Sequence, residues 1–461
     1  MKKIIASFVV IAALFSSQGW AELLNNYDCI SVNQDPQYMQ ELMSSGQYRQ
    51  ANKLTAQQLP TFDFNTSSSF AQYLAYAQKQ VALKKPLAEL PCPITTPTSE
   101  RLKLQGANNK LTQVKHLVAP FELKQKLSEN NNNAIVLIHG LTDSPFLFHD
   151  LAEHFYRQGF TVRTLLLPGH GTAPSDLIDV SYKDWQQAAD YIIERTLLDF
   201  EEVYLGGFST GGALIFNHLM QQQQVNAKIK GLIMWSPASK AKSDMAWLAK
   251  YLNAIPFMDW VDKDADTDFA KYESFPLNAG AQVHKLMSKI IGDKARKSNQ
   301  AHNIPLLVVA SEHDQTIDTA STLALMNFWQ TGQTDTTTPM RLMYFGDANK
   351  AKNKLAKQID VIVPSCQQEL CQQVINIAHT ATTNAPSNPH YGKQGAYRNC
   401  GHYLNDEEKY YACKTGDNVI YGEITPENLQ LAQPLQRLTY NPYYEEMLLT
   451  ITDFLNDIEK H

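Results

Sequence analysis

The sequence predicts an α/β fold built on a doubly wound, mostly parallel sheet. Short apolar runs alternate with helix-like segments over residues 116–380, which is the order expected of βαβ units. The first run, residues 134–138, is apolar without a break, as in strands that are buried on both faces of a parallel sheet. Further strands are expected at residues 160–166, 203–205, 231–235, 305–309 and 341–345, and helices at 150–158 and 185–198.

An N-terminal segment, residues 22–115, lacks this alternation and predicts a small helical module. Apolar side chains recur at helical spacing in residues 37–57 and 68–84. The proline-rich stretch 90–93 then ends the helical pattern. We expect this module to pack on the main domain as an extension, because one helix pair does not form a repeat array.

The main domain is expected over residues 116–461, with one long insertion. Residues 238–302 separate two of the expected strands and contain no clear strand of their own. In a doubly wound sheet, such an insertion covers the carboxyl ends of the strands, where ligands bind. We therefore expect a helical cap, in which Trp247 and Leu248 belong to an amphipathic helix. Packing within the cap is the favoured role of these side chains, and a transient contact with a membrane surface is the alternative.

Composition, charge and a leader-like segment limit the class of protein to which this chain can belong. The chain has 44% hydrophobic and 19% charged residues and a net charge of −6, which is typical of a globular protein and disfavours a nucleic-acid partner. Residues 1–21 resemble a secretory signal, with two lysines before the apolar run 4–15 and a cut expected after Ala21. An uncleaved anchor is the alternative, but the run is shorter than the ~20 residues that span a bilayer. We expect a periplasmic or secreted protein.

Six cysteines agree with export to an oxidising compartment, since their number is even. They are Cys29, Cys92, Cys366, Cys371, Cys400 and Cys413. Proximity in the sequence favours the pairs 366–371 and 400–413, which leaves Cys29 with Cys92, although six cysteines allow other pairings.

A serine bracketed by glycines follows the strand expected at 203–205. The pentapeptide Gly207-Phe208-Ser209-Thr210-Gly211 stands between that strand and a helix-like apolar run. On such a sharp turn the serine hydroxyl projects at the end of the sheet, and the glycines are needed because the turn is too tight for neighbouring Cβ atoms. A serine hydroxyl is a weak nucleophile, so a nucleophilic role requires a base and an orienting acid elsewhere in the chain.

Two backbone N–H groups beside Ser209 are expected to stabilise a negatively charged oxygen. Gly140 follows the first expected strand and lets the chain turn, so that the N–H of Leu141 faces the serine. Together with the N–H of Thr210 it would form an oxyanion hole. We expect the His139 imidazole to anchor this loop and assign the chemistry to the backbone.

Asp314 is the expected orienting acid. It lies just after the strand expected at 305–309, so it reaches the same edge of the sheet as Ser209. A buried carboxylate there would fix the tautomer of a histidine base and stabilise its protonated form. Asp318 and Glu312 are weaker candidates, and Asp318 is expected inside the helix that follows.

The expected base is His379. It is the first histidine after Asp314 in the sequence, and it follows the strand-like run 373–377. A loop directly after a strand is the expected position of the last triad member, which gives the chain order Ser, Asp, His. His390 and His402 are the alternative bases, and their other interpretation is as loop residues in a disulfide-tied segment.

These ordered motifs resemble the α/β-hydrolase superfamily. The motifs are His139-Gly140, the Leu-Pro-Gly-His-Gly run at 167–171, Gly207-x-Ser209-x-Gly211 and the Asp314 turn. The most similar branch comprises the monoacylglycerol lipases, lysophospholipases and serine aminopeptidases, and the similarity extends over residues 116–380. The resemblance implies an α/β-hydrolase fold, Ser209 as nucleophile, Asp314 as orienting acid, a late histidine as base, and oxyanion donors at Leu141 and Thr210.

Two features depart from this family pattern. The interval between Asp314 and His379 is long and holds the additional strand expected at 341–345. Residues 380–440 extend beyond the usual end of the family. Their many Tyr, Asn and Pro residues predict an ordered irregular excursion near the rim of the site.

No metal or cofactor is expected. The carboxylates from Asp262 to Glu273 have the spacing of an EF-hand calcium loop, but Thr267 stands where that turn needs glycine. A solvated acidic patch is therefore the favoured interpretation of this run.

The expected function is hydrolysis of carboxylic esters by a serine hydrolase, acting on a small ester or a lipid. An amide hydrolase such as an aminopeptidase is the first alternative, because the motifs do not distinguish the leaving group and the acids of residues 262–268 could bind a free amino group. A non-catalytic binding protein on the same fold is the second alternative.

Overall fold

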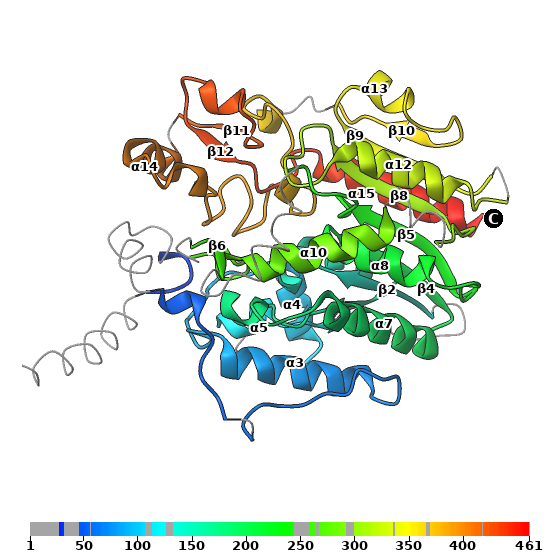
Figure 1. Ribbon diagram of the computed structural model, residues 1–461, viewed down its shortest axis with the longest axis horizontal. Helices are drawn as coiled ribbons and strands as arrows, with labels where there is room; N and C mark the ends of the chain where they lie inside the picture. Colours follow the sequence, from blue (N-terminus) through cyan, green and yellow to red (C-terminus); the bar gives the residue numbers. More distant parts are fainter. Residues whose placement is uncertain are drawn as a thin grey trace, which may run out of the picture.

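An α/β structure on one large sheet is seen in the computed structural model (Figure 1). The described residues are 27–31, 46–55, 57–106, 113–125, 132–243, 259–263, 267–291, 299–334, 337–365, 369–416 and 418–460.

Eight strands form the sheet in the order β1-β3-β2-β4-β5-β8-β9-β10. Their bounds are β1 Glu122–Leu123, β2 Asn133–Ile138, β3 Thr161–Leu165, β4 Glu202–Phe208, β5 Ile229–Trp235, β8 Leu306–Ser311, β9 Met340–Phe345 and β10 Asp360–Ile362. β1 runs antiparallel to β3, and the other neighbouring pairs are parallel. The predicted mostly parallel sheet is therefore confirmed.

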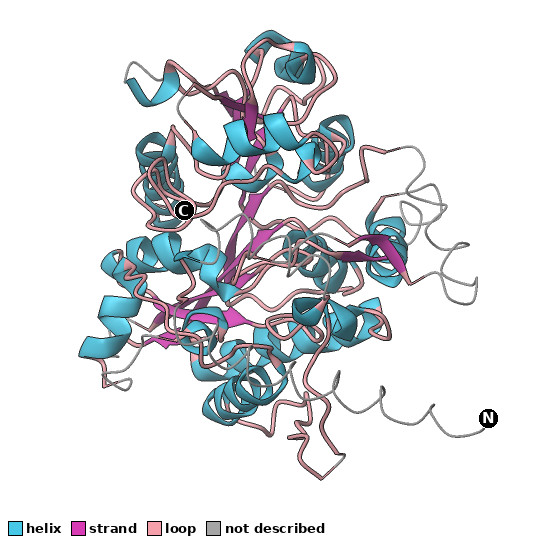
Figure 2. Cartoon of the chain, turned by 90° about the vertical axis from the view of Figure 1, so that its left-hand side faces the viewer, coloured by secondary structure: helices cyan, strands magenta, loops and turns pink. Residues whose placement is uncertain are grey.

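Helices cover both faces of this sheet, as the unbroken apolar run of β2 predicts (Figure 2). Because side chains alternate along a strand, Val136 and Ile138 enter one hydrophobic core, and Ile135 and Leu137 enter the other. The first core is completed by α7 (Tyr182–Asp199), α8 (Thr210–Met220) and α12 (Thr319–Gln330), and the second by α6 (His149–Arg157) and α15 (Tyr444–Glu459). The sequence analysis did not anticipate α15, which packs against β5 and β9.

The N-terminal segment contains three described helices, α3 (Phe70–Lys84), α4 (Pro97–Leu104) and α5 (Val114–Val118). α3 begins at a capping box formed by Ser69 and Gln72, and it buries an apolar face that joins the first core. Tyr73 on this face donates a hydrogen bond to the Leu166 carbonyl oxygen at 3.2 Å. The helix predicted at 37–57 is wrong within its described residues, which form the short 3₁₀ turn Gln47–Arg49 and extended chain.

The C-terminal excursion is ordered and irregular. It contains α14 (Glu407–Thr415), a parallel pair of short strands, β11 (Ile420–Gly422) and β12 (Leu435–Arg437), and several 3₁₀ turns. The strand predicted at 373–377 is wrong: this run forms one isolated bridge, between Val374 and Tyr421. Ile375 is 45% exposed, so not all apolar side chains of this run pack into a core.

The segment between β5 and β8 contains an antiparallel pair, β6 (Trp260–Asp262) and β7 (Phe275–Pro276), followed by α10 (Leu277–Ile290). α10 packs on α8. The predicted amphipathic helix around Trp247 and Leu248 lies outside the described residues. The described part of this segment is therefore a mixture of helix and short strands rather than helix alone. One further short helix, α13 (Ala348–Lys352), follows β9.

Two of the predicted disulfides are present, Cys29–Cys92 and Cys400–Cys413. The third predicted pair includes Cys366, which lies outside the described residues, as does the leader-like segment 1–21. Within the described part of the chain, no helix combines the length and the apolar character needed to cross a bilayer.

Candidate active site

Ser209 stands on a strained turn between β4 and α8. Its backbone has φ 49° and ψ −113°, a left-handed conformation that costs energy for a residue with a side chain. The flanking glycines allow this turn, because a Cβ on Gly207 would lie 2.5 Å from the Gly212 nitrogen and one on Gly211 would lie 1.9 Å from the Ile138 oxygen. The structure therefore holds the Ser209 side chain in one position, at the carboxyl end of the sheet.

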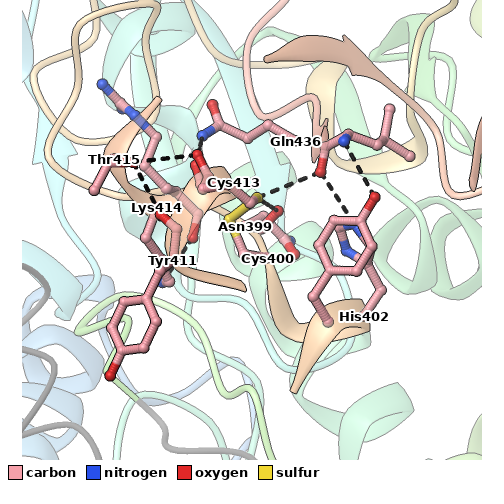
Figure 3. Close-up of a disulfide and its surroundings, with 12 residues drawn as sticks. Asn399, Cys400, His402, Tyr411, Cys413, Lys414, Thr415 and Gln436 are labelled. Carbon is pink, nitrogen blue, oxygen red and sulfur yellow. Dashed lines mark hydrogen bonds between the residues drawn. A yellow bond between two sulfur atoms is a disulfide. The ribbon is translucent and has the colours of Figure 1, made fainter. Parts of the chain in front are cut away.

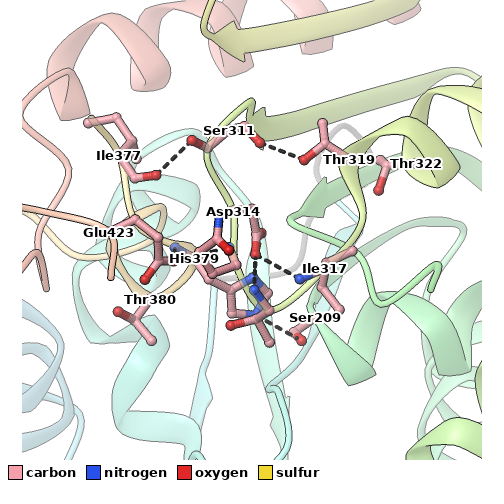
Figure 4. Close-up of polar contacts among 12 residues, drawn as sticks. Ser209, Ser311, Asp314, Ile317, Thr319, Thr322, Ile377, His379, Thr380 and Glu423 are labelled. Atoms are coloured by element: carbon pink, nitrogen blue, oxygen red, sulfur yellow. Dashed lines mark hydrogen bonds and ion pairs between the residues drawn. The ribbon is translucent and has the colours of Figure 1, made fainter. Parts of the chain in front are cut away.

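Three of the predicted site residues form one hydrogen-bonded chain (Figure 4). The Ser209 Oγ lies 3.1 Å from Nε2 of His379, and Nδ1 of His379 lies 2.7 Å from Oδ2 of Asp314. The exposed fractions of the three residues are 7%, 4% and 2%. The structure thus brings together a hydroxyl, an imidazole and a carboxylate in the order and distances that a serine nucleophile requires.

The other oxygen of Asp314 is held by the chain that follows β8. Its Oδ1 accepts hydrogen bonds from the N–H groups of Thr316 at 2.8 Å and Ile317 at 2.7 Å. The two weaker acid candidates have other partners: Asp318 caps α12 by accepting from the Ser321 N–H, and Glu312 pairs with Lys350. Asp318 is thus at the N-cap and not inside the helix, because its carboxylate satisfies the first free N–H groups of α12.

The two alternative histidines lie in other environments. His390 is completely buried, and its Nε2 lies 2.9 Å from Oδ1 of Asp268. His402 lies beside the Cys400–Cys413 disulfide, with its Nε2 3.1 Å from the Leu435 carbonyl oxygen (Figure 3). Burial lowers the pKa of His402 to about 4. Neither imidazole is hydrogen-bonded to Ser209.

The predicted oxyanion donors, the N–H groups of Leu141 and Thr210, flank Ser209. Both residues line the same cavity as Ser209. Thr142, next to Leu141, has φ 68°, and its carbonyl oxygen accepts a hydrogen bond from the Tyr272 N–H at 2.9 Å. The segment that follows β6 therefore helps to fix the conformation of the loop after β2.

His139 anchors the same loop, as predicted. Its Nε2 accepts a hydrogen bond from the Leu167 N–H at 3.1 Å, which leaves the proton on Nδ1, 2.8 Å from the Gly140 oxygen. Burial lowers the pKa of His139 well below its ordinary value, with the nearby His170 acting in the same direction. The ring is therefore neutral and joins the loop after β2 to the loop after β3.

A cavity of about 780 Å³ adjoins Ser209 and His379. Apolar side chains line much of it: Leu141, Phe208, Val261, Phe275, Leu277, Val283, Met287, Ile317 and Ile424. Polar lining residues include Asp262, Lys271, Glu273, His284, Tyr397, His402 and Arg437. The cavity is large enough for a drug-sized ligand and has the predominantly apolar lining of a small-molecule site.

The carboxylates Asp143, in the loop after β2, and Glu273 already have partners. Asp143 is buried, and its Oδ1 lies 3.7 Å from Nζ of Lys271. Burial raises the pKa of Asp143, and Lys271 opposes part of that rise. Glu273 accepts hydrogen bonds from the Thr267 N–H at 2.6 Å and the Tyr397 hydroxyl at 2.7 Å.

The prediction of a solvated acidic patch is wrong at Asp268. Its carboxylate is buried and accepts hydrogen bonds from His390 and from the Tyr391 hydroxyl, at 2.9 and 2.8 Å. Burial alone would raise the pKa of Asp268, but His390, the Ala270 N–H and the Tyr391 hydroxyl together outweigh it and lower that pKa. Asp264 and Asp266 lie outside the described residues, and among the described ones no group of three or more His, Cys, Asp or Glu side chains could hold a metal ion.

One ion pair near Ser209 and His379 was not expected from the sequence. It joins the buried Glu423, the residue after β11, to Arg437 on β12, with Arg437 Nε 2.7 Å from Glu423 Oε1. Oε2 of Glu423 accepts a hydrogen bond from the His379 N–H at 3.0 Å. No motif or periodic pattern marks either residue, because their pairing depends on how a segment without regular structure folds back.

Known proteins match the central part of the chain. A family model, Hydrolase_4, described as serine aminopeptidase S33, matches residues 129–338. The thermostable monoacylglycerol lipase of Bacillus sp. (strain H-257) is 23% identical over 193 residues, which span 41% of this chain and 74% of that protein. The carboxylesterase of Bacillus subtilis (strain 168) is 22% identical over 216 residues, 45% of this chain and 80% of that protein. A solved monoacylglycerol lipase structure from Paleococcus ferrophilus covers 53% of this chain and 88% of its own, with 20% identity and a TM-score of 0.35.

The sheet order and these matches define the protein as an α/β-hydrolase. The matched residues are similar to the hydrolase-4 family model and to a monoacylglycerol lipase, which supports a serine hydrolase. The resemblance drawn from the sequence motifs is thus confirmed, while the roles of individual side chains stay predictions. The N-terminal helices and the excursion 380–440 lie outside the matched residues 129–338.

Buried neutral histidines predict a loss of stability in acid. Burial lowers the pKa of His149 to about 3 and that of His170 to about 4, against about 6.5 in the unfolded chain. Because the folded pKa is the lower one, the stabilisation is complete above pH 6.5 and is lost as the pH falls toward 4 and 3. Each histidine should cost about 2 kcal/mol of unfolding free energy between pH 6.5 and 5, at 1.36 kcal/mol per pH unit.

Urea unfolding at pH 7 and at pH 5 measures this loss. A His149→Asn variant should lose about 2 kcal/mol less than the wild type between the two pH values, because one of the titrating histidines is absent. Equal losses in both proteins would show that His149 does not contribute.

Proposed function

We propose that this protein is a carboxylic ester hydrolase whose nucleophile is Ser209, with His379 as base and Asp314 as orienting acid. The observation that carries the proposal is the hydrogen-bonded chain from Ser209 Oγ through His379 to Asp314, beside a large and mostly apolar cavity.

The reaction would begin with proton transfer from Ser209 Oγ to Nε2 of His379 while Oγ attacks the ester carbonyl carbon. The carbonyl oxygen becomes an oxyanion that accepts hydrogen bonds from the N–H groups of Leu141 and Thr210. When the C–O bond breaks, His379 gives its proton to the departing alkoxide, which leaves an acyl-enzyme and an alcohol. A water molecule, deprotonated by His379, then attacks the acyl carbon, and Ser209 recovers its proton as the acid is released.

Asp314 would keep the His379 proton on Nδ1 and so present a basic Nε2 to Ser209. Its carboxylate would also stabilise the imidazolium that forms in each half of the reaction. The bonds from Thr316 and Ile317 support this role, because they hold the carboxylate without competing for Oδ2. The sequence of steps requires no cofactor.

The substrate is proposed to be a neutral ester with a sizeable apolar acyl chain, such as a lipid ester. The apolar wall contributed by β7, α10 and Ile424 supports an acyl group better than a charged one. Relatives described as a monoacylglycerol lipase and a carboxylesterase are consistent with this choice. Glu273 is hydrogen-bonded to Thr267 and Tyr397, and Asp143 is paired with Lys271, so neither carboxylate is free to bind an amino group. The aminopeptidase alternative would therefore depend on Asp262, which also lines the cavity.

The proposed location is the periplasm or the exterior of the cell. The leader-like residues 1–21 and the disulfides Cys29–Cys92 and Cys400–Cys413 support export to an oxidising compartment.

A panel of substrates tests the reaction class. We expect the purified protein to hydrolyse p-nitrophenyl esters, with kcat/KM rising from acetate toward medium-length acyl chains as more apolar surface enters the cavity. Aminoacyl p-nitroanilides, which release the same type of chromophore, should be hydrolysed far more slowly. Anilide hydrolysis as efficient as ester hydrolysis would contradict the ester assignment and favour the aminopeptidase.

A further inference from the structure

The carboxylate of Glu423 connects the two loops that carry the proposed acid and base. Its side chain is completely buried, and its Oε2 accepts a hydrogen bond from the His379 N–H at 3.0 Å (Figure 4). The same oxygen lies 3.5 Å from the N–H of Gln315, the residue after Asp314. One buried carboxylate therefore contacts the backbone on both sides of the Asp314–His379 hydrogen bond.

Arg437 completes this arrangement. Its Nε and Nη2 donate to Oε1 and Oε2 of Glu423 at 2.7 and 3.1 Å, and Nη2 also donates to the Thr316 hydroxyl at 3.2 Å. Burial alone would raise the pKa of Glu423, but the guanidinium and the N–H donors outweigh it and lower that pKa to about 2. Glu423 is therefore ionised over the whole working range of a serine hydrolase.

His379 depends on such contacts because regular structure does not hold it. It begins the three-residue 3₁₀ turn His379–Ala381 after a run with one isolated bridge. The neighbouring contacts are the Ser311 hydroxyl to the Ile377 oxygen, at 2.6 Å, and the Thr380 hydroxyl to the Leu438 oxygen, at 3.1 Å. Among these contacts, only that of Glu423 is a hydrogen bond to the backbone of His379 itself.

We propose that Glu423, held by Arg437, is a positioning residue that fixes the His379 backbone against the Asp314 loop. This inference rests on the proposed function, since it assumes that His379 is the base. It assigns a role to the excursion 380–440: β11 and β12 supply the ion pair that the long interval between acid and base requires. Glu423 itself does not line the cavity, although its partner Arg437 does, so we expect its main effect on the rate of the reaction, through His379.

The test compares Glu423→Gln with a matched control, Glu153→Gln. Glu153 is also a nearly buried carboxylate that accepts from two arginines, Arg101 and Arg157, but it lies on α6 away from the triad. Both variants remove the negative charge of a carboxylate that forms ion pairs with arginine. At a temperature where circular dichroism shows each variant folded, we expect Glu423→Gln to lower kcat about 10- to 100-fold, because small displacements of a reacting group cost that much. KM should change by less than about threefold, and Glu153→Gln should change neither constant.

A second variant covers the case in which Glu423→Gln does not fold. Glu423→Asp keeps a charge opposite Arg437 but shortens the reach to the His379 N–H, so kcat should fall while the fold is retained. If the Glu423 variant that folds has the wild-type kcat, the positioning role is wrong. It is also wrong if kcat falls as much in Glu153→Gln as in Glu423→Gln. Failure of the proposed function is a separate result: His379→Ala would then keep activity in the otherwise wild-type protein.

Discussion

A Ser209→Ala variant is expected to lose ester hydrolysis by about 10⁶-fold in kcat, leaving only the slow reaction that oxyanion donors and substrate binding support without a nucleophile. The reason is that Oγ of Ser209 is the hydroxyl bonded to His379, at 3.1 Å, beside the cavity. The measurement is the initial rate on the best p-nitrophenyl ester of the panel, with thermal unfolding as the check on structure.

Ser236→Ala is the matched control for this variant. Ser236 follows the adjacent strand β5, is buried and also has a left-handed backbone, with φ 42°. Its hydroxyl has no hydrogen-bond partner among the described residues, so its removal should leave the rate near the wild-type value. Equal rates in Ser209→Ala and the wild type would contradict the nucleophile assignment.

A His379→Ala variant is expected to lose about as much activity as Ser209→Ala, because a serine without its base is a weak nucleophile. Esterase rates of the purified variants measure this. Imidazole added to the solution should restore part of the rate, since the vacated space beside Asp314 can accept a free imidazole of the same shape.

His402→Ala and His390→Asn separate the three candidate histidines. His402 lines the cavity but bonds to the Leu435 oxygen, so its variant should change KM more than kcat. His390→Asn should lose about 3 to 5 kcal/mol of stability, because Asp268 would keep a buried charge without its main partner. If one of these two variants loses the activity instead of His379→Ala, the assignment of the base is wrong.

Local patterns in the sequence were sufficient for the six inner strands of the sheet, while the short edge strands β1 and β10 were not predicted. The run 134–138 predicts a strand that is buried on both faces, and β2 contributes to both cores. Ser209 and Asp314 could be predicted for the same reason, since each directly follows a strand, and parallel strands end at one edge of the sheet. The geometry at these two positions is set by neighbours in sequence.

The proposed base was harder to predict, because His379 is placed by contacts distant in sequence. The preceding run 373–377 has the alternation of a strand, yet it forms one bridge and not a ladder. What holds His379 is Glu423, 44 positions further along the chain, together with Arg437. Such a pair leaves no periodic signal in the sequence, and only the folded excursion brings it to the acid.

Covalent trapping tests the central claim most directly. A fluorophosphonate reacts with a serine hydroxyl only when a base and an oxyanion hole activate it, so it reports the assembled site without assuming a substrate. We predict one adduct per chain, located on Ser209 by mass spectrometry of the peptide that contains residues 207–211, with no labelling of His379→Ala over the same time. An adduct on another serine, or unchanged labelling of Ser209→Ala, would contradict the account.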